Sequence, residues 1–88
     1  MKKILPLLLL SVLLSINIQA QSLKQNVADK YYAALAYEKC APMYAELASK
    51  DKATTEIIRK AGDSYRLLNA PKDAEKWYTK LTTKPDAQ

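Results

Sequence analysis

From residue 23 onward, apolar residues recur every three or four positions, the spacing that places side chains on one face of an α-helix. Four such stripes follow one another, each separated from the next by a short polar or small-residue segment. The stripes are Leu23, Val27, Tyr31 and Leu35; Cys40, Tyr44, Leu47 and Ala48; Ile57, Ala61, Tyr65 and Leu68; and Ala74, Trp77, Tyr78 and Leu81. Nothing in the sequence shows the strict alternation of a β-strand. The pattern therefore predicts an all-α fold with four helices.

Signals for helix ends agree with these stripes. Ser22, followed three residues later by Gln25, has the form of a capping box and predicts that the first helix begins there. Pro71 suits the first position of a helix, where a fixed φ and a missing N–H cost nothing, so the fourth helix should open at Pro71. Asp73 then lies near the positive end of that helix dipole. Pro42 falls about one turn into the second helix, where we expect a tolerated proline or a slight bend.

Residues 1–20 have the three parts of a secretory signal peptide. A positive start, Met1-Lys2-Lys3, precedes a leucine-rich apolar run over residues 4–18, and small Ala20 ends the segment. An uncleaved membrane anchor is the alternative, but the run contains polar residues and is shorter than the ~20 apolar residues that a span needs. We predict cleavage after Ala20 and a mature chain without a membrane span. That chain would be exported, and either periplasmic or associated with the outer membrane.

The predicted mature chain repeats itself, because one shift along the sequence superposes several identical residues. These identities are Asp29 on Asp63, Tyr31 on Tyr65, Ala36 on Ala70, Tyr44 on Tyr78, Leu47 on Leu81 and Lys50 on Lys84. We call the displacement that carries Asp29 onto Asp63 the repeat shift. The two blocks that it relates, residues 21–54 and 55–88, together use the whole mature chain. Each block is therefore predicted to form one pair of antiparallel helices.

With two helices per unit, the repeat shift resembles the period of about 34 residues that is typical of the tetratricopeptide repeat (TPR) family. The resemblance covers residues 24–85. In that family small residues set the distance between helices, and aromatic rings fill the wedge between units. The matching positions here are Ala28, Tyr31, Cys40, Tyr44 and Leu47 in the first unit and Gly62, Tyr65, Ala74, Tyr78 and Leu81 in the second. Leu47 and Leu81 depart from the alanine that is usual in the family. The resemblance implies two TPR-like repeats, a right-handed α-solenoid fragment that binds other proteins.

A second resemblance concerns the leader ending Asn-Ile-Gln-Ala-Gln-Ser together with residues 28–32 and 62–66. These segments are similar to the amino-terminal region of OmpA-family cell-envelope proteins, which join helical repeats to a propeller and a peptidoglycan-binding domain. Neither later domain is in this sequence, so no residue here takes on a wall-binding role. The resemblance implies an alternative function, the amino-terminal fragment of a larger peptidoglycan-associated protein with an anchoring role. Because solenoids generally need about three repeats, further repeats, domains or a partner are expected.

The composition argues against catalysis. The chain has no histidine, one cysteine and one glycine, which removes the usual general base, the commonest metal ligand and a phosphate-cradling loop. Its carboxylates form no pair or cluster with a supporting third group, and we interpret them as solvated. Loss of Lys2 and Lys3 with the leader lowers the net charge from +5 to +3, and basic residues alternate with acidic ones. We expect no enzyme activity, no cofactor, no metal and no nucleic-acid partner.

Cys40 and the aromatic residues each allow two interpretations. Cys40 could be a reactive thiol or form an intermolecular disulfide, but its place on a helical stripe favours a small buried residue. The tyrosines and Trp77 could form a stacking platform, but most lie on the apolar stripes and are predicted to belong to the core.

Residues of the first helix of each unit that are not needed for packing are the candidates for binding a partner. By helical spacing they share the concave face of the predicted solenoid: Gln25, Asp29, Tyr32, Arg59, Asp63 and Arg66. The alternative is a solvated face with an i,i+4 pair between Arg59 and Asp63. Asp29 and Asp63 stand where TPR members that grip a peptide carboxylate use asparagine, so a carboxy-terminal peptide is not the expected ligand. We expect a protein partner of the cell envelope.

Overall fold

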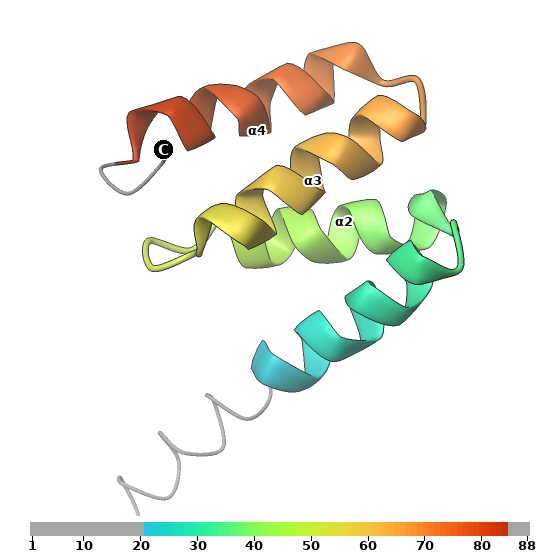
Figure 1. The fold of residues 1–88 in the computed structure, drawn as a ribbon. Helices are drawn as coiled ribbons and strands as arrows, with labels where there is room; N and C mark the ends of the chain where they lie inside the picture. Colours follow the sequence, from blue (N-terminus) through green and yellow to red (C-terminus); the bar gives the residue numbers. More distant parts are fainter. Residues whose placement is uncertain (1–20, 85–88) are drawn as a thin grey trace, which may run out of the picture.

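The computed structural model describes residues 21–84, and this part of the chain is helical with no strand (Figure 1). A first helical segment, residues 21–33, precedes α2 (Tyr37–Ala48), α3 (Thr55–Leu67) and α4 (Pro71–Thr83). The predicted all-α fold with four helices is therefore confirmed for these residues. The signal peptide predicted over residues 1–20 lies outside them. Within the described range, no helix has the length and apolar character to cross a membrane.

Each helix packs against the next one in chain order (Figure 1). α3 lies between α2 and α4 and contacts both. Lys80 of α4 also reaches back to the end of α2, where its Nζ donates a hydrogen bond of 2.5 Å to the carbonyl oxygen of Ala48. Because the last turn of α2 has no basic residue of its own, Lys80 supplies the positive charge that a helix carboxyl end favours.

The turn between the first helical segment and α2 has the same geometry as the turn between α3 and α4. Leu35 has φ 63° and Asn69 has φ 62°, both in the left-handed region. In each turn the amide of the following residue donates to the carbonyl oxygen five residues earlier, at 2.9 Å, which is the Schellman arrangement that ends a helix. The repeat shift carries Leu35 onto Asn69, so the backbone repeats at the period seen in the sequence.

The helix starts agree with the sequence in part. α4 opens at Pro71 with Asp73 in its first turn, and α2 continues through Pro42, both as predicted. The capping box at Ser22 is wrong, because residues 21 and 22 are already helical and an N-cap residue must be non-helical. The side-chain cap of α3 is instead Thr54, whose hydroxyl oxygen accepts from the amide of Ile57 at 3.2 Å.

The core lies between the first helical segment, α2 and α3, and α4 contributes Trp77 to it. It contains Ala28, Cys40, Tyr44, Leu47, Ala48, Ala53, Ile57, Ile58, Ala61 and Trp77. Of the positions assigned to the repeat, Ala28, Cys40, Tyr44, Leu47, Gly62 and Ala74 are buried, whereas Tyr31, Tyr65, Tyr78 and Leu81 are partly buried.

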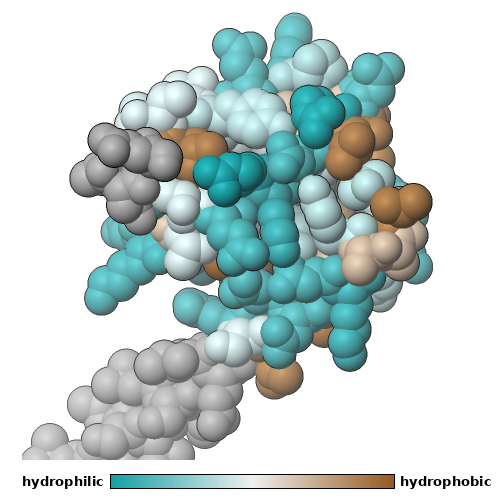
Figure 2. Space-filling view, in the orientation of Figure 1, coloured by the Kyte–Doolittle hydropathy of each residue, from teal (hydrophilic) through white to brown (hydrophobic). Residues whose placement is uncertain are grey.

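Not every residue of the predicted stripes is buried. Leu23 is 63% exposed and Val27 is 41% exposed, because no described element covers their side of the first helical segment. Leu35 does not continue a helical stripe as predicted, since it lies in the turn and is 69% exposed. Leu68, at the end of α3, is 37% exposed. On the face seen in Figure 2, hydrophobic residues form small separate groups on a mainly hydrophilic surface.

Candidate partner-binding surface

A buried tyrosine and an aspartate join α2 to the first helical segment. The Tyr44 hydroxyl donates to Oδ1 of Asp29 at 2.5 Å, and the Tyr44 side chain is fully buried. Burial, followed by the hydrogen bond to the Asp29 carboxylate, raises the pKa of Tyr44 far above its usual value. Tyr44 therefore stays a neutral donor, and Asp29 is committed to an internal contact.

Lys60 of α3 reaches this same pair. Its Nζ lies 3.1 Å from Oδ1 of Asp29 and 3.4 Å from Oε1 of Glu56. It also lies 5.6 Å from the centre of the Tyr32 ring and 5.9 Å from that of Tyr44, within cation–π range. Burial of the ammonium opposes ionisation, but the hydrogen bond and charge of Asp29, helped by Glu56, raise the pKa of Lys60. Lys60 thus connects three helices.

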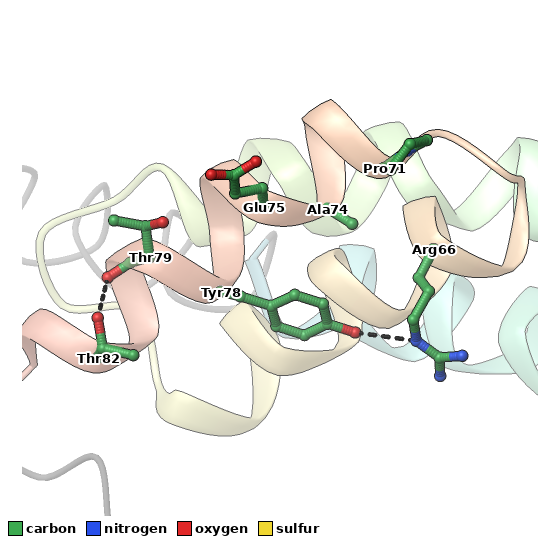
Figure 3. Close-up of a pocket in the computed structure, with 7 residues that line it drawn as sticks. All are labelled: Arg66, Pro71, Ala74, Glu75, Tyr78, Thr79 and Thr82. Carbon is green, nitrogen blue, oxygen red and sulfur yellow. Dashed lines mark hydrogen bonds between the residues drawn. The ribbon is translucent and has the colours of Figure 1, made fainter.

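Asp63 and Tyr78 repeat the arrangement in the second unit. The Tyr78 hydroxyl donates to Oδ1 of Asp63, and Nε of Arg66 donates to the Tyr78 hydroxyl oxygen at 3.2 Å (Figure 3). A guanidinium nitrogen of Arg66 is 3.9 Å from Asp63. Burial and the Asp63 carboxylate raise the pKa of Tyr78 against the opposing effect of Arg66. The hydrogen bond with Tyr78 also raises the pKa of Arg66.

Tyr32 packs against the first arrangement, and the charge of Asp63 in the second arrangement acts on its hydroxyl. Its ring makes edge-to-face contacts with Tyr37 at 5.6 Å and with Tyr44 at 5.9 Å between ring centres. Burial, then the nearby charge of Asp63, raises the pKa of Tyr32. We call this group of linked side chains the Asp–Tyr face. Its members are Asp29, Tyr32, Tyr44, Lys60, Asp63, Arg66 and Tyr78.

Of the six residues proposed from the sequence, Asp29 and Tyr32 belong to the contacts around Lys60, and Asp63 and Arg66 belong to the contacts around Tyr78. Gln25 lies instead in a different groove, together with Lys50 and Thr54. Arg59 is exposed on α3, and the ion pair of Asp63 within residues 21–84 is with Arg66 and not with Arg59.

Lys60 and the two tyrosine hydroxyl contacts were missed at the sequence level. Lys60 is 31 residues from Asp29, and each tyrosine is 15 residues from its aspartate, distances that helical periodicity does not report. The repeat shift did carry one signal, because it aligns both the aspartates and the tyrosines. Two residue types that recur together across an internal shift can be partners, and here they are.

A groove of about 390 Å³ runs along α4 and includes Arg66 of α3, so that it shares Arg66 and Tyr78 with the Asp–Tyr face (Figure 3). Its lining combines a tyrosine ring, small residues and a few polar side chains: Arg66, Pro71, Ala74, Glu75, Tyr78, Thr79 and Thr82. The groove is open along its length, so it can accept an extended element such as a helix rather than an enclosed small molecule.

Cys40 is fully buried, as expected for a packing residue, with its Sγ 3.4 Å from Oγ of Ser64. In the part of the chain that the structure describes, no group of three or more cysteine, aspartate or glutamate side chains is placed to hold a metal ion.

Comparison with protein-family models, with curated proteins and with solved structures gave no match for this chain. The TPR and OmpA-family resemblances therefore stay predictions from the sequence.

Proposed function

We propose that the protein is an exported scaffold for protein–protein interaction in the bacterial cell envelope, built from two tandem TPR-type repeats. Its role is binding and not catalysis. The signal-peptide pattern of residues 1–20 supports export, and the chemistry of the Asp–Tyr face supports binding.

The observation that carries the proposal is the recurrence of one set of contacts at the period of the sequence repeat. The repeat shift carries the hydrogen bond from Tyr44 to Asp29 onto the hydrogen bond from Tyr78 to Asp63. Such recurrence is what a helix-pair module used twice would produce, and modules of this kind present a continuous surface to a partner.

The chemistry of the Asp–Tyr face favours a protein ligand with an acidic side chain. Both aspartates accept from a tyrosine hydroxyl and pair with a cation, so their charge is compensated within the face, and Arg66 has its most exposed charged side chain. The Arg66 side chain is 59% exposed, and its guanidinium can accept a bidentate carboxylate. Arg59, on the same helix, adds a second exposed positive charge.

Site-specific photo-crosslinking in intact cells tests this function. A photoreactive amino acid replaces Arg59, which is exposed on α3 one turn before Asp63, or, as the matched control, Glu38, which is exposed on α2. The proposal expects a discrete adduct from position 59 and none from position 38. Adding Arg66→Glu to the position 59 protein should weaken the adduct, because the charge that attracts the partner is reversed. Equal adducts from both positions, or no adduct at position 59, would argue against a binding face here.

Export is tested separately on the same cells. The mass of the protein recovered from the envelope fraction should correspond to a chain beginning at Gln21. Recovery of an intact 88-residue chain in the cytoplasmic fraction would reject the export part of the proposal and leave the binding part open to its own experiment.

A further inference from the structure

The groove on α4 corresponds, residue by residue, to the part of α2 on which α3 packs. Reversing the repeat shift places Ala74 on Cys40, Tyr78 on Tyr44 and Thr82 on Ala48. Those three α2 residues are all fully buried. In α4, Ala74 is still buried, whereas Tyr78 is only partly buried and Thr82 is exposed. The second unit therefore leaves partly open to solvent the surface that α3 covers in the first unit. We call this surface of α4, formed by Ala74, Tyr78 and Thr82, the seat.

The helix that covers the corresponding surface in the first unit is α3, and one side of it makes the contact. Ser64 touches Cys40 of α2, with 3.4 Å between Oγ and Sγ. Ala61 and Ile57, three and seven residues before Ser64, lie on the same side of the helix and are buried in the same cluster. The element that fits the seat is thus a helix with small and aliphatic residues at this spacing.

The first helical segment is the counterpart of α3 under the same repeat shift, and it offers the same side to solvent. The residues corresponding to Ile57 and Ala61 are Leu23 and Val27, which are 63% and 41% exposed where their counterparts are 8% and 0% exposed. One end of the described chain thus has the seat, and the other has a helix shaped to enter it.

We propose that a second copy of this chain docks the Leu23–Val27 side of its first helical segment into the α4 groove, so that copies associate head to tail. The substitutions at the corresponding positions are complementary in charge. Lys30 replaces Ser64, and Glu75 replaces the buried Ala41, next to the residue that Ser64 contacts. Lys30 of one copy would then lie beside Ala74 and within reach of Glu75 of the other copy.

This contact joins two different surfaces, so each copy that docks leaves one of each surface free. Contacts of this kind build rings or open chains and not closed two-fold dimers. The α4 groove shares Arg66 and Tyr78 with the Asp–Tyr face, so the two proposals are separated through Leu23, Val27 and Lys30, which belong to neither the groove nor that face.

A cysteine-pair experiment follows from the mapped contact. The contact between Cys40 and Ser64 corresponds to Ala74 of one copy against Lys30 of the next. The full chain is expressed in a Cys40→Ala background, which puts at position 40 the residue found at its counterpart. The Lys30→Cys protein and the Ala74→Cys protein are each purified in the form that the cells produce, including any processing. The two proteins are then mixed and oxidised.

The expected product is a disulfide-linked pair of chains from this mixture and a ladder of longer products when both cysteines are in one chain. The matched control pairs Ala74→Cys with Glu38→Cys, which is exposed on α2 and is not part of the first helical segment. Equal yields from the two mixtures would overturn the proposal.

Sedimentation velocity over a range of concentrations provides the second test. It uses protein that keeps Cys40 and has no introduced cysteine. The average mass should rise with concentration, and Val27→Asp should weaken the association by more than about tenfold, because it puts a charge into the seat. Ala33→Asp is the matched control on the same helix, since its counterpart Leu67 is 44% exposed and outside the seat. A chain that stays monomeric throughout would overturn the proposal, even if the α4 groove were found to hold a helix of another protein.

The photo-crosslinking experiment distinguishes the two proposals, because an adduct between two copies of this chain differs in mass from an adduct with another protein. Either proposal can therefore fail without the other.

Discussion

Tyr44 and Tyr78 occupy the same place in the two halves of the molecule, yet only Tyr44 is fully buried. Both donate to an aspartate 15 residues earlier. In the first half the aspartate also receives Lys60 from the following helix, whereas in the second half the cation, Arg66, comes from the same helix as its aspartate. The same sequence pattern therefore yields a fully buried residue where a further helix covers it and a partly buried residue where no described helix does.

The difference shows that in this chain a helix pair is not a self-sufficient unit. Its internal contacts are set by its own residues, but burial of its aromatic position depends on the neighbour that follows. Substituting equivalent residues in both halves measures what the neighbour contributes, and the substitutions below do so from the largest expected effect to the smallest.

Truncation of the two tyrosines should give the widest contrast. We expect Tyr44→Ala to lower the free energy of unfolding by about 3–5 kcal/mol, because it leaves a large cavity in the core. A domain of this size is stabilised by about 3–5 kcal/mol in all, so this variant should be largely unfolded. Tyr78→Ala should cost only about 1–2 kcal/mol. Urea titration followed by far-ultraviolet circular dichroism measures both, and equal costs would contradict the difference in burial.

Removal of the aspartates tests the same contrast through hydrogen bonding. Asp29→Ala leaves the buried Tyr44 hydroxyl without its acceptor and should cost about 1–3 kcal/mol. Asp63→Ala should cost less than about 1 kcal/mol, because Tyr78 is partly exposed and water can replace the carboxylate. Asp29→Asn keeps an acceptor oxygen and should recover part of the loss, which separates hydrogen bonding from packing in the same urea titrations.

Alkaline pH should weaken the first half more than the second. The pKa values of Tyr44 and Lys60 are both raised in the folded protein, so their contribution to stability is complete below about pH 10 and is lost as the pH rises further. Each group adds a slope of at most about 1.4 kcal/mol per pH unit. Urea midpoints measured between about pH 8 and 11 should fall, and Tyr44→Phe should flatten that fall more than Tyr78→Phe. Identical pH profiles for both variants would mean that Tyr44 is not the titrating group.

The two left-handed turns give the smallest contrast. The positive φ of Leu35 costs about 1 kcal/mol that glycine would not incur, and its side chain is exposed, so Leu35→Gly should be stabilising by roughly that amount. Asn69 tolerates the same conformation, so Asn69→Gly should change the unfolding free energy by only a few tenths of a kcal/mol. Thermal unfolding of the two variants tests this prediction, and Leu35→Gly is expected to have the higher midpoint temperature.

The features predicted well from the sequence are those set by residues close together in the chain. Helical periodicity and Pro71 were sufficient to place four helices and the start of α4, because helices depend on local spacing and on the φ of proline. The packing role of Cys40 followed from its place on a stripe.

The failures have physical causes that periodicity does not contain. Leu35 continues an apolar stripe in the sequence, but the chain turns there, and apolar character alone does not distinguish a last helical residue from a turn residue. Leu23 and Val27 lie on a stripe that no described element covers, since a pattern indicates which face is apolar and not whether a neighbour exists. Asp63 pairs with Arg66 and Tyr78 in place of Arg59, because a ring from the next helix fixes the carboxylate on that side.

Because Cys40 is completely buried between α2 and α3, the rate at which its thiol is alkylated reports how often the folded protein opens locally. A thiol with no accessible surface can be alkylated only during the intervals when the helices packed around it separate. At a reagent concentration high enough to trap every opening, the labelling rate equals the frequency of that separation, and at lower concentrations it gives the population of the separated state. The rate of this local opening can thus be measured on the native sequence, because Cys40 is itself the labelling site and no cysteine has to be introduced.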